Sequence, residues 1–116
     1  MKALFKKIIF IQIFTMAFVA TTTAKVADEK ITATFKVYGQ CGECKERIEN
    51  GLQTKGITYA EWNETTKELT VTYNPKKITL DEIHKKVNEI GYDTDKYKTT
   101  DEANGKLPKC CQRGGH

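Results

Sequence analysis

Apolar and polar residues alternate along residues 31–38, "ITATFKVY", and the apolar positions are Ile31, Ala33, Phe35 and Val37. A repeat of two residues over this length is typical of a half-buried β-strand. From Cys44 the apolar spacing lengthens to four, through Ile48 and Leu52, with charged residues between. This spacing predicts a short amphipathic helix, and Gly56 is expected to end the helical segment.

Two β-rich runs follow, "ITYAEW" at residues 57–62 and "ELTVTY" at residues 68–73, with the polar segment "NETTK" between them. This arrangement predicts a β-hairpin. The face that the first of these strands buries is left open, because Ile57, Ala60 and Trp62 do not fall on one side of a regular strand.

A second helix is predicted from Leu80, because Thr79 before it and Glu82 in its first turn fit a capping box. Its apolar positions continue at helical spacing until Gly91 stops it. A short last strand is expected in "YDTDKYK", residues 92–98. The tail that follows has no sustained apolar period, and its last residues are expected to be mobile.

The predicted order β-α-β-β-α-β corresponds to a ferredoxin-like α+β fold. Such a fold has a four-stranded antiparallel sheet with both helices on one face. The end of the first strand, the start of the first helix and the turn before the last strand then meet at one edge. Cys41, Cys44 and Tyr92 are therefore expected to be neighbours.

Residues 1–24 have the order of a secretory signal peptide: a lysine-rich head, an apolar run and small residues ending at Ala24. The run from Ile8 to Ala20 is thirteen residues long, whereas a membrane-spanning helix needs about 20. We therefore expect export to the periplasm or the exterior, without a permanent membrane anchor. The remaining chain divides into an N-terminal extension at 25–30, a folded domain at 31–98 and a cysteine-containing tail at 99–116.

Three of the 19 basic residues and none of the 15 acidic residues lie in residues 1–24, so the rest of the chain has a net charge near +1. This balance provides no electrostatic footprint for nucleic acid. The length suits one small domain, which we expect to be monomeric.

The pair Cys41 and Cys44, in "CGEC", is compatible with a redox disulfide, half of a zinc site or a two-thiolate clamp for a soft metal ion. Cys44 at a helix N-terminus is expected to have a lowered pKa, which favours the thiolate. Two thiolates suit Cu(I) or Hg(II), whereas Zn(II) usually takes four ligands. The alternative is a periplasmic thiol–disulfide oxidoreductase that uses the same pair.

The segment from Ile31 to Lys98 resembles the heavy-metal-associated domain family of copper chaperones, metal-pumping ATPases and the periplasmic mercury-binding protein. The resemblance is carried by C-x-x-C-K-E-R-I-E-N-G-L after a strand and by Gly91-Tyr92 after the second helix. It departs from the family at Tyr38 and Gly39, where a Gly-Met pair is usual.

The resemblance implies a binding protein rather than an enzyme. Cys41 and Cys44 would capture Cu(I), with Hg(II) and Zn(II) as alternatives, beside Tyr92 and Gly39. The ion would pass by ligand exchange to a metal-transporting membrane protein or to another metal-binding domain.

Cys110 and Cys111 lie in the tail, beyond the segment that carries this resemblance. Adjacent cysteines rarely bond to each other, because their Cα atoms are about 3.8 Å apart and a disulfide usually requires about 4.4–6.8 Å. Either one or both of them join Cys41 and Cys44 as third or fourth ligands, or they cap the empty site as a disulfide. Alternatively they form a separate tail site or an unstructured thiol pair. His84 is expected to be a solvated surface residue, and His116 a frayed chain end.

Overall fold

A computed structural model describes residues 29–114 of the chain. The expected signal peptide, most of the N-terminal extension and His116 lie outside the described residues. None of the helices within residues 29–114 has the length and apolar character needed to cross a membrane.

The sheet contains β1 (Ile31–Lys36), β2 (Ile57–Trp62) and β3 (Glu68–Tyr73), in the spatial order β1-β3-β2 with antiparallel pairing. The predicted hairpin is confirmed at the expected residues. Its register shifts between Ile57 and Tyr59, where β2 departs from regular pairing with β3. Since a bulge changes which side of a strand each residue faces, this shift explains the irregular pattern of apolar residues in β2.

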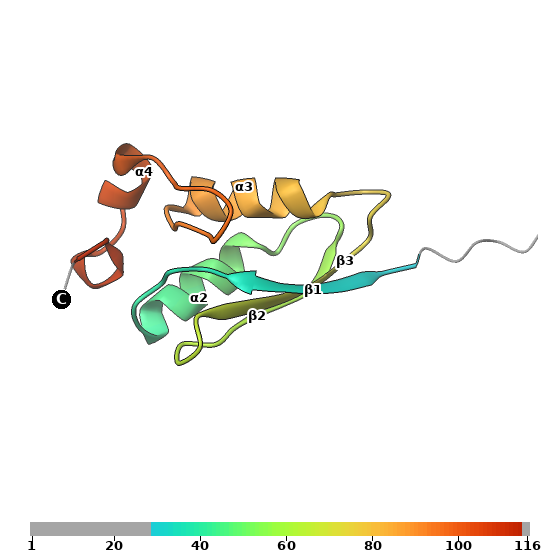
Figure 1. Cartoon of the computed structure of the whole chain (residues 1–116), viewed down its shortest axis with the longest axis horizontal. Helices are drawn as coiled ribbons and strands as arrows, with labels where there is room; N and C mark the ends of the chain where they lie inside the picture. The colour runs from blue at the N-terminus through green and yellow to red at the C-terminus, as the bar shows by residue number, and fades with distance from the viewer. Residues whose placement is uncertain (1–28, 115–116) are drawn as a thin grey trace, which may run out of the picture.

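Two helices, α2 (Gly42–Gly51) and α3 (Leu80–Ile90), cover one face of the sheet (Figure 1). The Thr79–Glu82 capping box at the start of α3 is formed by both side chains, as predicted. Gly91 ends α3 with φ of 123°, a backbone conformation that favours glycine. Both helices bury apolar side chains against the inner face of the sheet in a single core.

The predicted fourth strand is wrong: among the described residues, segment 92–98 forms only an isolated bridge between Val37 and Thr94. The Thr94 hydroxyl oxygen accepts hydrogen bonds from the backbone N–H groups of Lys96 and Tyr97, at 3.2 and 3.1 Å. Such local bonds compete with strand pairing and fold the segment into a turn. The ferredoxin-like arrangement is therefore present with three strands in residues 29–114.

The tail is more ordered than its composition suggests. It forms a short helix, α4 (Asp101–Gly105), and a 3₁₀ turn, η2 (Lys109–Cys111). Thr100 caps α4 by accepting a hydrogen bond from the backbone N–H of Ala103 at 3.0 Å. The tail therefore has regular structure as far as Cys111, and α4 packs beside the end of α3 (Figure 1).

His84 is buried rather than solvated, with 3% of its surface exposed. Its ring stacks on Phe35 with ring centroids 3.8 Å apart, and its Nδ1 lies 2.8 Å from the Thr94 hydroxyl oxygen. Burial lowers the pKa of His84. The prediction failed because His84 lies at the margin of the apolar stripe of α3, and segment 92–98 covers that margin.

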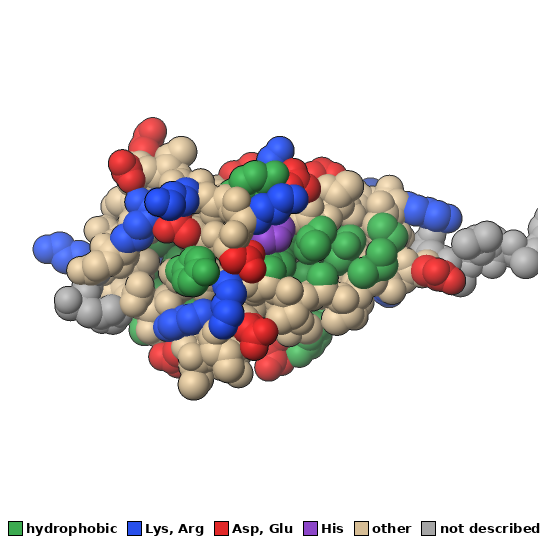
Figure 2. All heavy atoms as spheres, viewed as in Figure 1, with side chains coloured by type: hydrophobic (Ala, Val, Ile, Leu, Met, Phe, Trp, Pro, Cys, Tyr) green, Lys and Arg blue, Asp and Glu red, His purple; other side chains and the backbone are tan. Residues whose placement is uncertain are grey.

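Acidic and basic side chains are interspersed on the face of the molecule that Figure 2 presents. This distribution accords with the near-neutral balance of charges in the sequence beyond residue 24.

Candidate metal centre

Cys41 and Cys44 lie where the chain passes from β1 into α2. Cys41 is the N-cap residue of α2, in an extended conformation, and Cys44 lies in the first turn of the helix. Their sulfur atoms are 3.7 Å apart. Cys44 is fully buried and Cys41 is half-buried, so one sulfur is anchored in the core while the other is accessible from outside.

The loop before Cys41 rests on Trp62, the last residue of β2. The indole Nε1 donates a hydrogen bond to the carbonyl oxygen of Val37 at 2.9 Å. A Cβ atom on Gly39 would lie 2.9 Å from the Trp62 ring and 3.2 Å from Cys44 Cβ. Gly39 therefore allows the loop to pack closely against the indole. The sequence places Trp62 in the predicted hairpin and carries no signal of this support.

The start of α2 lowers the pKa of the Cys41 thiol. The backbone N–H of Cys44 makes the largest contribution in lowering the pKa of the Cys41 thiol, and partial burial opposes it. The Cys110 thiol and the backbone N–H of Glu43 lower it further. The lowered pKa predicted for Cys44 has no counterpart in this structure, because Cys44 is disulfide-bonded and does not titrate. The helix begins at Gly42, so Cys41 occupies the cap position.

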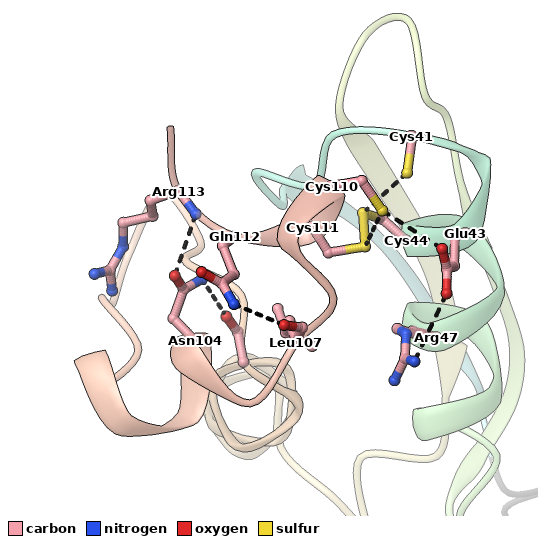
Figure 3. The surroundings of a disulfide bond; sticks show 11 residues. Cys41, Glu43, Cys44, Arg47, Asn104, Leu107, Cys110, Cys111, Gln112 and Arg113 are labelled. Carbon is pink, nitrogen blue, oxygen red and sulfur yellow. Dashed lines mark hydrogen bonds and ion pairs between the residues drawn. A yellow bond between two sulfur atoms is a disulfide. The ribbon is translucent and has the colours of Figure 1, made fainter. Parts of the chain in front are cut away.

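The tail brings two more sulfur atoms to this edge (Figure 3). Cys111 is buried and forms a disulfide with Cys44, with Cα atoms 5.8 Å apart. Cys110 carries a free thiol 3.8 Å from the Cys111 sulfur and 3.4 Å from a Glu43 carboxylate oxygen. Its hydrogen bond with Cys41 is the main factor that raises the pKa of Cys110 to about 11.

The Cys44–Cys111 bond leaves Cys41 as a free, half-buried thiol. The sulfur atoms of Cys41, Cys44 and Cys111 all lie within 4.8 Å of one another, a spacing that a single metal ion can bridge. A metal ion held by all three cysteines would use the sulfur atoms of Cys44 and Cys111, which the disulfide also uses. The bound ion and the disulfide therefore cannot be present at the same time.

Tyr92, which the sequence placed near the cysteines, is 1% exposed. Burial raises the pKa of Tyr92 to about 12; the charge of Arg47 opposes this shift and that of Cys41 adds to it. The phenol therefore keeps its proton at neutral pH. Its hydroxyl has no hydrogen-bond partner within the part of the chain that the structure describes.

The family model of the heavy-metal-associated domain matches residues 34–93, just over half of the chain. The chain belongs to the heavy-metal-associated domain family. The match begins within β1, covers the cysteine pair, β2, β3 and both helices α2 and α3, and ends before the tail cysteines.

Relatives of this heavy-metal-associated domain occur both as small proteins and within pumps. The chain is 40% identical over 73 residues to a copper-exporting P-type ATPase of Staphylococcus saprophyticus, covering 61% of this chain and 9% of the ATPase. It is 32% identical over 54 residues to the copper chaperone CopZ of Staphylococcus aureus, covering 46% of this chain and 79% of CopZ. The similarity to the pump therefore concerns only a small part of its length.

Among solved structures, oxidized MerP from Ralstonia metallidurans CH34 has the same fold. The two share 20% sequence identity with a TM-score of 0.54, over 58% of this chain and 96% of MerP. At this identity the likeness concerns the fold alone.

Proposed function

We propose that this protein is an exported soft-metal carrier that captures Cu(I) between Cys41 and Cys44. The observation that carries the proposal is the pair of sulfur atoms 3.7 Å apart at the β1–α2 edge, within a heavy-metal-associated domain. Thiolates prefer soft ions such as Cu(I), and the lowered pKa of Cys41 favours the thiolate that such an ion requires.

Cargo would leave by ligand exchange. Because Cys41 is half-buried beside the buried Cys44, a thiolate of a partner protein has access to the ion from the Cys41 side. The partner sulfur adds to the ion before Cys41 or Cys44 dissociates, so the ion passes on without being released. Metal transfer of this kind requires no catalytic residue, and we propose a binding protein rather than an enzyme.

The partner that we propose is a copper-transporting membrane ATPase or another heavy-metal-associated domain. The relatives named as copper exporters and a copper chaperone support copper as the cargo over Hg(II) or Zn(II). The leader-like order of residues 1–24 supports export, as a monomer, to the periplasm or the exterior. The intact mass of protein from its native compartment tests this, and a chain starting near Lys25 is expected.

A thiol–disulfide oxidoreductase is the alternative function, and the Cys44–Cys111 bond is the observation in its favour. That activity at "CGEC" requires a disulfide between Cys41 and Cys44 that opens and closes during turnover. In the structure Cys44 bonds to the tail instead, and Cys41 is a free thiol. We therefore favour metal capture.

Anaerobic competition for Cu(I) against a chromophoric chelator tests the proposal. The reduced Cys41→Ser, Cys44→Ser double variant should lose Cu(I) affinity by orders of magnitude, because a serine hydroxyl is a poor ligand for this soft ion. Cys110→Ser is the matched control, since it also removes a thiol near the loop but leaves the pair intact. If the double variant competes as well as the unmodified protein, the assignment of Cys41 and Cys44 is wrong.

A further inference from the structure

Arg113 fastens the end of the tail to the domain without any covalent bond. Its Nε and Nη2 donate to the two carboxylate oxygens of Asp93, at 2.6 and 3.0 Å. Its Nη1 donates to Asp101 Oδ1 at 2.8 Å, and its Nη2 also donates to the carbonyl oxygen of Thr99 at 2.9 Å. This bidentate contact with Asp93 fixes the position of the backbone two residues beyond Cys111.

The tail before Cys111 is held by packing and by buried hydrogen bonds. Asn104 is buried and donates from Nδ2 to the carbonyl oxygen of Gly91 at 3.0 Å. Leu107 is 5% exposed and packs on Gly91, where a Cβ atom would lie 2.9 Å from Leu107 Cγ. The Gln112 side chain donates to the carbonyl oxygen of Leu107 at 2.8 Å. None of these contacts involves the disulfide, so we expect them to keep Cys111 beside the loop when that bond is reduced.

The two tail cysteines differ in where their sulfur atoms lie (Figure 3). Cys111 is 1% exposed, and its sulfur belongs to the cluster within 4.8 Å that includes Cys41 and Cys44. Cys110 is half-buried and its sulfur contacts the Glu43 carboxylate. Cys110 also hydrogen-bonds to Cys41, but it is not part of the cluster in which every sulfur atom lies within 4.8 Å of the others. Of the two tail cysteines, Cys111 is therefore the one placed to share an ion with both members of the pair.

We propose that Cys111 is the third thiolate ligand of the metal centre, with Cys41 and Cys44, and that the Cys44–Cys111 disulfide is the closed state of that same centre. This inference rests on the proposed function and names how the site is regulated. Three thiolates surround Cu(I) more completely than two, so the reduced protein retains the ion until a partner thiolate displaces Cys111.

Opening the centre requires a reductant, which we take to be a dithiol of the compartment. The dithiol breaks the Cys44–Cys111 bond by thiol–disulfide exchange and becomes a disulfide, while Cys44 and Cys111 receive two electrons and two protons as thiols. Cu(I) then displaces the thiol protons as it binds. A disulfide of the compartment reverses the change in the empty protein: it accepts two electrons and two protons from the Cys44 and Cys111 thiols and becomes a dithiol as the Cys44–Cys111 bond re-forms. The closed centre then takes up no ion through Cys44.

The test compares the full-length protein with Cys111→Ser and Cys110→Ser. All three are reduced with a phosphine that is then removed, so the disulfide is absent from each and its effect on folding does not enter. X-ray absorption at the copper edge counts sulfur ligands, and chelator competition measures affinity. We expect three sulfur ligands in the unmodified protein and in Cys110→Ser.

For Cys111→Ser we expect two sulfur ligands and Cu(I) affinity at least roughly tenfold weaker, equivalent to about 1.4 kcal/mol. Two sulfur ligands in the unmodified protein, or equal affinity in Cys111→Ser, would overturn the inference while leaving the Cys41–Cys44 proposal intact. If instead the proposed function is wrong, the Cys41→Ser, Cys44→Ser variant will bind Cu(I) with undiminished affinity.

The closed state is tested by omitting the reductant. The oxidised full-length protein should show two reactive thiols and weaker Cu(I) binding than the reduced protein, whereas Cys111→Ser should bind equally well before and after reductant treatment. Equal binding by the oxidised and reduced unmodified protein would contradict a closed state.

Discussion

Replacing Cys111 with serine should lower the stability of the oxidised protein far more than any other change in the tail. The Cys44–Cys111 disulfide joins residues 67 positions apart and therefore restricts a large part of the unfolded chain. For a loop of this length, the chain-entropy model predicts a contribution of about 4 kcal/mol. Small domains have a total unfolding free energy of about 5–15 kcal/mol, so the loss would be a large fraction of the total.

Urea unfolding followed by circular dichroism measures this effect with and without reductant. Oxidised Cys111→Ser should unfold with a free energy about 4 kcal/mol below that of the oxidised unmodified protein. For a domain of this size, the corresponding fall in the melting temperature is about 15–30 °C. Cys110→Ser keeps the disulfide, and its unfolding free energy should match that of the unmodified protein within about 0.5 kcal/mol, because the Cys110 side chain is only half-buried.

The reduced proteins separate the disulfide from the serine itself. Without the bond, the unmodified protein and Cys111→Ser should differ by no more than about 1–2 kcal/mol, the cost of burying a hydroxyl in place of a thiol. If the oxidised unmodified protein and Cys111→Ser unfold at the same urea concentration, the bond between the tail and α2 does not stabilise the fold as reasoned.

Three further predictions concern the support of the loop, the docking of the tail and the buried histidine. Trp62→Phe removes the hydrogen bond to the Val37 carbonyl and should cost about 1–3 kcal/mol in urea unfolding, whereas an unchanged midpoint would exclude the indole as a support. Gly91→Ala places a Cβ atom 2.8 Å from the Ala103 carbonyl oxygen, so tail thiols in the reduced protein should be alkylated faster than in the unmodified protein; equal rates would contradict this. Burial depresses the pKa of His84 in the folded state, so its contribution to stability is complete above the unfolded pKa of about 6.5 and declines as pH falls below it. The melting temperature should therefore fall less between pH 7.5 and pH 5 in His84→Gln than in the unmodified protein. If it falls equally in both proteins, the assignment is refuted.

The elements that the sequence predicts correctly are those specified by neighbouring residues. The hairpin of β2 and β3 follows from two β-rich runs around a polar turn, and α3 follows from its capping box and from Gly91. The C-x-x-C pair at the start of α2 is likewise a local pattern, and it predicts the candidate metal site without reference to any tertiary contact.

The prediction of a short last strand failed at segment 92–98. Thr94 binds nearby backbone N–H groups and turns the chain after a single bridge to Val37. His84 was misplaced for a related reason, because the residues that bury it come from β1 and from this turn. Neither contact leaves a periodic signal in α3 itself.

By itself, the sequence determined the order of the main elements and the thiol pair that makes this a candidate soft-metal protein. Tertiary structure decided that Trp62 supports the loop through Val37, and that Cys111 rather than Cys110 reaches Cys44. Periodicity and helix capping depend on residues a few positions apart in the sequence. These two contacts instead join residues that are 25 and 67 positions apart. Such distant contacts depend on how the whole core packs, and only the folded chain specifies them.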